Sequence, residues 1–257
     1  MLLERKMVLY LPVLTFHALD DQSSVISFSP ELFRSGIAKL YEKGYRTVSL
    51  LEAANFLGRG KPFPDRSFVI TFDDGYESIY KEAFPVLQYY GLSATVFLTV
   101  GEKEVTNPAY RLPSLNGRSM LSWPEIQEMT RGGIIFGAHT LNHPDLTRIP
   151  RERMEAEIRD SKKIIENTLG TPVSSFAYPY GRYNKSIQDL VQRHFVCACS
   201  DKLGLMSVDS DPYALERVDA YYLRTDKLFD LIWTRAFPSY IQVRGIFRRI
   251  RRAIQLS

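Results

Sequence analysis

Apolar runs of strand length alternate with helical segments along most of this chain, and this order restricts its fold more than any other feature. Strands are predicted at residues 8–16, 48–51, 67–72, 94–100, 134–138, 174–178 and 195–199. Helices are predicted from Ser29, over 77–90, from Ser122, over 152–169 and over 184–194. Such alternation is typical of a parallel sheet or barrel surrounded by helices. With 257 residues, 45% of them apolar, the chain can form one large core, so we expect a single α/β domain.

Two adjacent carboxylates stand where the predicted strand at residues 67–72 ends. Asp73 and Asp74 follow the apolar run directly, and Gly75 marks a sharp exit from it. The two side chains would point to opposite faces of a regular strand, but at a strand end that turns on glycine both can face one pocket. Alone, the segment is also compatible with an ordinary turn.

Two histidines hold the same kind of position after another predicted strand. His139 follows its strand directly, and Pro144 disfavours helical geometry at His143, so we expect a loop in which both rings turn towards Asp74. Imidazoles and a carboxylate suit zinc or a similar divalent ion, and three protein ligands with a free fourth position form a hydrolytic site. We therefore predict Asp74, His139 and His143 as metal ligands and Asp73 as the general base that takes a proton from water.

These segments resemble the motifs of the polysaccharide deacetylases, the family of the NodB-homology domain and carbohydrate esterase family four. Residues 71–75 (Thr-Phe-Asp-Asp-Gly) and 139–144 (His-Thr-x-x-His-Pro) are similar to its first two motifs, and residues 175–181 to its third. The likeness runs from about Val13 to Leu223. It implies a distorted (β/α) barrel of the NodB-homology type and a hydrolase that removes acetyl groups from N-acetylated or O-acetylated sugars. It also implies a divalent cofactor, Zn²⁺ first, with Co²⁺, Ni²⁺ or Mn²⁺ as alternatives.

The resemblance gives each matching residue a role. It implies that Asp73 is the base, that Asp74, His139 and His143 hold the metal, and that the backbone N–H of Tyr180 helps to hold the oxyanion. A donor of this kind is worth roughly 3–4 kcal/mol of activation barrier. Without the resemblance, the Tyr-Pro-Tyr-Gly segment around Tyr180 would be interpreted as a turn after a strand.

The chain departs from the family pattern in two places. Ala177 stands where many members carry an arginine that steadies the base. No histidine follows His194 to supply the general acid of the family's C-terminal motif. His194 itself is expected where a helix ends and a strand begins, at the wrong end of a barrel for catalysis, and is interpreted as structural.

Two residues are candidates for the missing roles. His17 ends the first predicted strand, which neighbours the last strand in a closed barrel. It either faces the site as the general acid or forms a structural hydrogen bond at the strand end. Arg217, similar to the arginine of a later block in one branch of the family, either pairs with Asp73 or forms a surface salt bridge.

The basic residues are concentrated in a tail, residues 241–257, that follows the predicted barrel, residues 1–240. The tail holds five of the 33 basic residues, which leaves 28 against 29 acidic ones, so we do not expect nucleic acid to bind the barrel. Residues 246–254 place apolar side chains on one helical face and arginines on the other. We expect either a basic amphipathic helix for a membrane surface or an acidic partner, or a helix packed on the barrel with solvated arginines. The arginines that would contact a membrane are Arg248, Arg249, Arg251 and Arg252.

Cysteine usage and the N-terminus favour the cytoplasm. Cys197 and Cys199 are two residues apart in a predicted strand, where a disulfide would be strained, so we expect free buried thiols. The apolar start contains Tyr10 and Pro12 and lacks a small-residue cleavage site, so no signal peptide is predicted. We expect a cytoplasmic protein that meets its substrate at the inner face of the membrane.

The function predicted from these features is metal-dependent deacetylation of a polysaccharide, or of its lipid-linked or oligosaccharide precursor, most simply at N-acetyl groups. Two alternatives stay open. A carbohydrate-binding pseudoenzyme on the same barrel would explain the missing arginine and acid, although an intact base and metal triad argue against it. An O-deacetylase or a deformylase of a lipid-linked sugar would use the same site.

Overall fold

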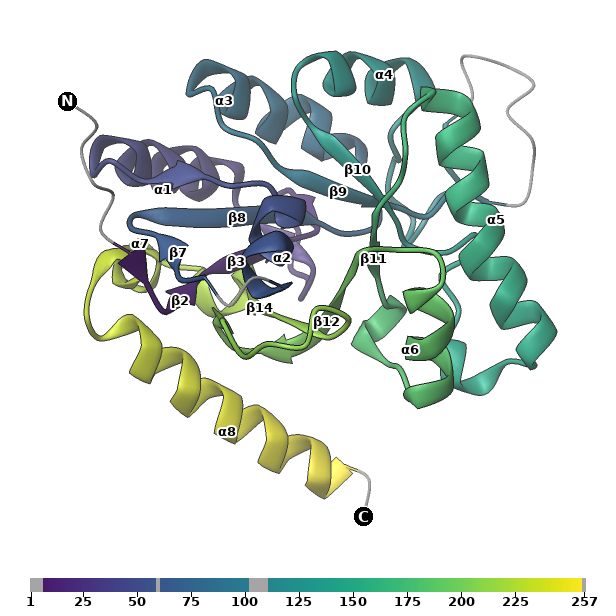
Figure 1. Cartoon of the computed structure of the whole chain (residues 1–257). Coiled ribbons are helices and arrows are strands. Elements are labelled where there is room, and N and C mark those ends of the chain that lie inside the picture. Colours follow the sequence, from purple (N-terminus) through teal and green to yellow (C-terminus); the bar gives the residue numbers. More distant parts are fainter. Residues whose placement is uncertain (1–6, 59–60, 102–110, 256–257) are drawn as a thin grey trace.

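Seven parallel strands close into a barrel at the centre of the molecule (Figure 1). The computed structural model describes residues 7–58, 61–101 and 111–255, without the side chains of Met7 and residues 252–255. Neighbouring strands follow the order β3–β14–β12–β11–β10–β9–β8, and β8 pairs with β3 to close the circle. They are β3 (Val13–Phe16), β8 (Ser67–Phe72), β9 (Thr95–Leu98), β10 (Ile135–Ala138), β11 (Ser175–Ala177), β12 (Cys197–Leu203) and β14 (Leu215–Asp219). The predicted (β/α) barrel is therefore confirmed, as a distorted relative of the eight-stranded form.

Short strands extend or cover this barrel. β6 (Arg46–Thr47) pairs with the start of β8. Three small two-stranded sheets lie outside it: β1 (Met7–Val8) with β7 (Phe63–Pro64), β2 (Tyr10–Leu11) with β13 (Met206–Ser207), and β4 (Ala18–Leu19) with β5 (Ser27–Phe28).

Helices fill the connections between the strands, and several begin at the predicted capping residues. They are α1 (Pro30–Glu42), α2 (Leu50–Gly58), α3 (Phe84–Tyr89) after a π-helical turn at Ile79–Ala83, α4 (Trp123–Arg131), α5 (Arg151–Leu169), α6 (Lys185–Gln192), α7 (Asp226–Phe229) and α8 (Phe237–Gln255). The side chains of Ser29, Ser122 and Asn184 accept hydrogen bonds from the first turns of α1, α4 and α6. Gly170 ends α5 in the left-handed conformation, with φ of 67°.

Two predicted strands are wrong in their extent. The run at residues 8–16 is broken into β1, β2 and β3, and Pro12, which has no N–H to donate to a strand partner, stands between the last two. In place of the strand predicted at 48–51, residues 48 and 49 lead into α2 and residues 50 and 51 begin it. Ser49 caps this helix: its hydroxyl accepts from the N–H of Glu52 at 3.1 Å, and the Glu52 carboxylate accepts from the N–H of Ser49 at 2.9 Å. This reciprocal capping box is readable in the sequence Ser-Leu-Leu-Glu and favours a helix over a strand.

The barrel strands form a rigid apolar base beneath their polar C-terminal ends. All six residues of β8 are buried. The ring of Phe72 at its end lies 5.5 Å from Phe16 and 5.9 Å from Phe33. Each buried phenylalanine contributes about 1.5–3 kcal/mol to stability, so the backbone from which Asp73 and Asp74 emerge is held firmly.

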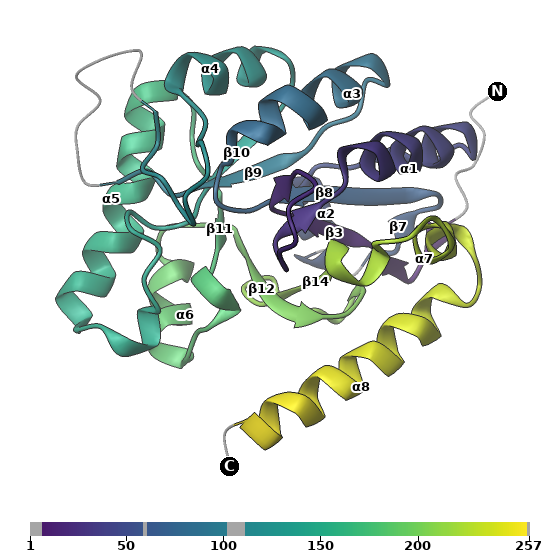
Figure 2. The ribbon, with the colours of Figure 1, turned by 180° about the vertical axis from the view of Figure 1, so that it is seen from behind.

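The last helix, α8, lies apart from the helices that surround the barrel, as both views show (Figures 1 and 2). The barrel end predicted at residue 240 falls within this helix. Across the described ranges, the structure has no helix with both the length and the apolar composition needed to span a membrane.

Candidate metal and catalytic site

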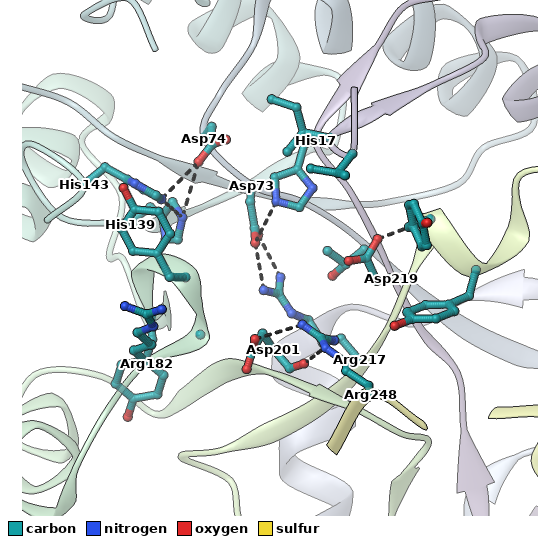
Figure 3. A pocket seen from close by; sticks show the side chains of 18 of the residues that line it. His17, Asp73, Asp74, His139, His143, Arg182, Asp201, Arg217, Asp219 and Arg248 are labelled. Atoms are coloured by element: carbon teal, nitrogen blue, oxygen red, sulfur yellow. Dashed lines mark hydrogen bonds and ion pairs between the residues drawn. The ribbon is translucent and has the colours of Figure 1, made fainter. Parts of the chain in front are cut away.

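The residues predicted from the sequence line one pocket at the C-terminal end of the barrel (Figure 3). The pocket has a volume of about 520 Å³. Its lining includes all seven predicted side chains: His17, Asp73, Asp74, His139, His143, Tyr180 and Arg217. Active sites of (β/α) barrels occupy this end of the strands. His194 does not line the pocket and lies half-buried beside Phe195.

Three possible ligand atoms converge at one side of the pocket. Oδ1 of Asp74 lies 3.4 Å from Nε2 of His139 and 3.4 Å from Nε2 of His143, and the two Nε2 atoms are 3.2 Å apart. Atoms bound at about 2.0–2.1 Å to a tetrahedral Zn²⁺ are about 3.3–3.4 Å from one another, so this spacing fits such an ion. Oδ1 of Asp74 is also a buried oxygen without a hydrogen-bond partner among the described residues, as a metal ligand would be once its ion is removed.

The backbone adopts the left-handed conformation at the residues that bring these atoms together. The φ angle is 75° at Asp74, 71° at Thr140 and 54° at His143. Residues other than glycine rarely adopt this conformation, which costs about 1–2 kcal/mol each. The reversal at Asp74 ends the alternation of a regular strand, so Asp73 and Asp74 both line the pocket. The reversals in the histidine loop bring the ring of His143 to 4.7 Å from that of His139.

A backbone carbonyl of the third motif, residues 175–181, orients the ring of His139. Nδ1 of His139 lies 2.7 Å from the carbonyl oxygen of Ala177. Because a carbonyl can only accept, Nδ1 carries the proton and Nε2 is left to bind an ion. Ala177 thus contributes to the site although its side chain cannot replace the arginine of the family pattern.

A buried glutamate that the sequence analysis missed holds the loop between the two histidines. Glu157 of α5 is 1% exposed. Its carboxylate accepts hydrogen bonds from the backbone N–H of Leu141 at 2.8 Å and of Asn142 at 2.9 Å, and Arg153 pairs with it at 2.9 Å. Hydrogen bonds to a carboxylate are about twice as strong as neutral ones, so this residue fixes the loop. Its position in a helix rich in charged residues gave no sign that it is buried.

Asp73 is held by Arg217 from β14. Both terminal nitrogens of the guanidinium donate to the carboxylate, Nη1 to Oδ1 and Nη2 to Oδ2, each at 2.7 Å. Arg217 also donates from Nε to the carbonyl of Ser200 at 3.0 Å, so its direction is fixed. Burial by itself raises the pKa of Asp73, but the charge and hydrogen bonds of Arg217 outweigh it and hold that pKa below its usual range. Asp73 is therefore ionised at neutral pH. The structure places Arg217 inside the site and not in a surface salt bridge.

His17 lies on another side of Asp73, with 3.9 Å between its Nε2 atom and Oδ2 of Asp73. Its side chain is 23% exposed and faces the pocket. Figure 3 shows Asp73 in the middle of the group, with the metal triad to one side and His17 and Arg217 around it. A proton donor at His17 and a base at Asp73 would both reach a substrate bound between them.

The protonation states of His143 and Asp74 also suit a metal. Burial lowers the pKa of His143 to about 4, helped by the neighbouring His139, so this ring is neutral at pH 7. Burial opposes ionisation of Asp74, yet contact with His139 and the charges of the nearby histidines hold its pKa far below the usual range. A neutral imidazole and an ionised carboxylate are the forms that bind a divalent ion.

Tyr180 forms an open rim beside the triad. Its ring packs edge-on against that of His143, with 4.6 Å between the centroids, and the residue is 57% exposed. It follows β11 with φ of 58°, another left-handed residue in this region. An exposed aromatic ring next to the ligands offers an apolar face on which a sugar ring can pack.

Further residues complete the lining of the pocket. Asn116 belongs to a loop whose residues 102–110 lie outside the described part of the chain. Charged and aromatic lining residues come from the loop after β11, from β12, from β14 and its continuation, and from α8: Arg182, Asp201, Asp219, Tyr221, Tyr222, Arg248 and Arg251. Arg248 and Arg251 were predicted to lie in a separate tail, whereas the structure brings them to the wall of the pocket.

Comparison with known proteins identifies relatives over most of the chain. The family profile described as polysaccharide deacetylase matches residues 60–196. YxkH, a protein of Bacillus subtilis (strain 168) named for the same family, is 30% identical over 209 residues, which cover 81% of this chain and 70% of YxkH. The poly-beta-1,6-N-acetyl-D-glucosamine N-deacetylase of Staphylococcus aureus (strain MRSA252) is 30% identical over 167 residues, covering 62% of this chain and 55% of that enzyme. The chain therefore spans only about half the length of this second relative.

A solved structure supports the same relationship. The deacetylase PplD of Streptococcus pyogenes, determined in complex with acetate, superposes with a TM-score of 0.73 at 26% identity. The alignment covers 83% of this chain and 93% of PplD.

Proposed function

Since this chain belongs to the polysaccharide deacetylase family, we propose that it is a divalent-metal-dependent hydrolase that removes N-acetyl groups from an amino-sugar polysaccharide or its precursor. The observation that carries this proposal is the convergence of Asp74, His139 and His143 beside an Asp73 that Arg217 keeps ionised. The name of the Staphylococcus aureus relative supports the N-acetyl bond. The acetate in PplD supports acetate as the product.

The metal would be held by Asp74, His139 and His143. When bound, such an ion supplies a Lewis acid that polarises the acetyl carbonyl and lowers the pKa of water to about 7. Zn²⁺ fits the mixed nitrogen and oxygen donors best, and Co²⁺, Ni²⁺ and Mn²⁺ share them.

The protein's own groups would carry the proton transfers. Asp73 takes a proton from the water that adds to the amide carbonyl. The backbone N–H of Tyr180 donates to the developing oxyanion. His17 then gives a proton to the amine nitrogen as the carbon–nitrogen bond breaks, so that acetate and a free amino sugar leave. Arg217 touches neither water nor acetyl group in this scheme and acts by positioning Asp73.

The two alternative functions make different demands on these residues. A glycan-binding pseudoenzyme would not need the carboxylate of Asp73 held in a bidentate pair with Arg217. Hydrolysis of an O-acetyl ester needs less help from an acid, because an alkoxide is a better leaving group than an amide anion. The position of His17 within reach of the site therefore favours N-deacetylation.

We propose that the protein acts in the cytoplasm, at the inner face of the membrane. Cys197 and Cys199 are both free and buried, as predicted, which suits a reducing compartment. A peripheral contact through the arginine-rich end of α8 belongs to this proposal.

The test is metal analysis of the purified protein together with acetate release from a panel of N-acetylated and O-acetylated glycans. We expect about one divalent ion per chain and acetate release from N-acetylated oligosaccharides, lost on chelation and restored by Zn²⁺. Glycan binding without acetate release would establish the pseudoenzyme, and release from O-acetylated glycans alone would establish the esterase.

A further inference from the structure

The helix α8 carries apolar side chains on two opposite sides, one buried and one exposed. Phe237 and Ile241 are buried, and Gly245 lies close enough to the barrel that a Cβ there would sit 3.3 Å from the carbonyl of Leu203. Arg248 continues this inner line, since it donates to the backbone carbonyl and the carboxylate of Asp201 at 2.8 and 2.9 Å.

The opposite side of α8 carries four large apolar side chains, which we call the outer strip: Val243, Ile246, Phe247 and Ile250. They are 50%, 42%, 62% and 51% exposed in that order. At about 100° per residue, these positions fall on the face opposite Ile241 and Gly245. A helix that only covered a barrel would place its apolar stripe inward and its charges outward. The first turns of α8 follow this rule, with Phe237 and Ile241 inward, whereas its later turns expose the outer strip.

All charged side chains in the sequence of α8 are positive. Its sequence contains five arginines and no aspartate or glutamate. Helical spacing puts Arg244 and Arg251 on one flank of the outer strip and Arg249 on the other. From such flanks the long side chains can reach past the strip and keep their guanidinium groups in a polar layer.

We propose that the outer strip and its flanking arginines dock this protein onto an anionic membrane surface. An interfacial helix needs a contiguous apolar face with cationic flanks, and the outer strip with its arginines has this composition. A second copy of the chain is a poorer partner, because a symmetric pairing of two outer strips would bring the arginines of both copies together.

Docking through α8 would place the catalytic pocket beside the lipid. Arg248 and Arg251 line that pocket, so α8 is part of its wall. Bound to a bilayer by the outer strip, the protein would hold the pocket next to the headgroup layer. Resting on the proposed deacetylase function, this geometry indicates that the sugar substrate is anchored to the membrane by a lipid.

Co-sedimentation of the full chain with vesicles tests the docking surface. The probes are vesicles of phosphatidylcholine alone and of phosphatidylcholine with a third of phosphatidylglycerol. We expect binding to the anionic vesicles only. The double variant Phe247→Asp/Ile250→Asp should weaken it at least about 100-fold, since two buried apolar side chains are lost and two negative charges gained. Arg244→Gln/Arg249→Gln should weaken it about fivefold for each arginine.

A matched control uses exposed apolar residues elsewhere. Tyr89 and Val196 are 82% and 50% exposed, and Tyr89→Asp/Val196→Asp should bind the vesicles like the unaltered protein. The outer-strip, arginine and control variants should keep their melting temperature and their hydrolysis of a soluble acetylated oligosaccharide, which separates failed docking from failed catalysis. Asp73→Asn, inactive but folded, should still bind.

Three results would overturn the proposal. The first is equal vesicle binding by the unaltered protein and the outer-strip variant. The second is no binding of the unaltered protein to anionic vesicles. The third is a dimer in solution that the outer-strip variant dissociates, which would identify a second copy as the occupant.

Discussion

Arg217 holds Asp73 in a bidentate ion pair, with both nitrogen–oxygen distances at 2.7 Å and both side chains almost fully buried. The two residues are 144 positions apart in the sequence and meet because β14 and β8 both pair with β3. The pair explains how this chain keeps a low-pKa base in a buried place although Ala177 occupies the position of the family's arginine.

Replacing Arg217 tests this relationship. In Arg217→Met the burial of Asp73 is no longer offset, so its pKa rises and the base is protonated over a wider pH range. We therefore expect the acidic limb of the pH profile of kcat/KM to move to higher pH, and kcat/KM at pH 7 to fall about 10- to 100-fold. The metal content should not change. An unmoved acidic limb, with activity lost equally at every pH, would mean that Arg217 is only structural.

The base can be separated from the ligands by Asp73→Asn. This variant keeps the shape of the side chain and the three metal ligands, so it should bind the ion as the unaltered protein does. It should lose acetate release by at least about 100-fold, the usual contribution of a general base. Elemental analysis and an acetate assay on the same preparation show whether Asp73 acts as the base or as a metal ligand. Loss of the metal together with activity would make Asp73 a ligand.

His139→Ala should remove the ion. Nε2 of His139 is one of the three converging ligand atoms, and its Nδ1 is already committed to the carbonyl of Ala177. We expect metal occupancy to drop below about one tenth under dialysis that leaves the unaltered protein loaded, with no detectable hydrolysis. His194→Ala is the matched control, since His194 does not line the pocket, and it should keep its metal. Full metal occupancy in His139→Ala would show that His139 is not a metal ligand.

The sequence allowed the chemistry of the site to be predicted because that chemistry depends on residue types at strand ends. Asp73, Asp74 and His139 follow directly after apolar runs, and parallel strands bring such ends together. The predicted barrel follows from the same alternation. The strand at residues 48–51 was wrong because the capping box of Ser49 and Glu52 decides the local structure there.

The sequence could not reveal which charged side chains are buried, or which side of a helix faces the barrel. Nothing in the charged run of α5 distinguishes Glu157, which is buried, from Glu155, which is partly exposed. The amphipathic pattern of α8 was visible, but the pattern cannot say which side faces the barrel. The structure shows that Arg248 turns inward to Asp201 and that Phe247 and Ile250 turn outward.

Glu157→Gln tests whether this buried carboxylate positions the metal ligands. The amide can still accept from one or two N–H groups, but its NH₂ group would face the donors of Asn142 and Arg153. We expect metal affinity to fall about 10- to 100-fold, as for other partners that orient metal ligands. Glu155→Gln on the same helix removes an exposed pair with Arg151 and should change nothing. Unchanged affinity in Glu157→Gln with a lowered melting temperature would limit Glu157 to stability.

The role of His17 can be isolated by changing the leaving group. A general acid matters most when the departing nitrogen must be protonated before its bond to carbon breaks, and little when the leaving group is already stable as an anion. His17→Gln should therefore lower kcat on an N-acetylated oligosaccharide about 100- to 1,000-fold, yet lower hydrolysis of 4-nitrophenyl acetate less than about fivefold. Metal content should remain that of the unaltered protein, because His17 lies beside Asp73 and outside the triad. Equal losses on both substrates would show that His17 positions Asp73 or the water, and the acid would then have to be sought among the other pocket-lining residues.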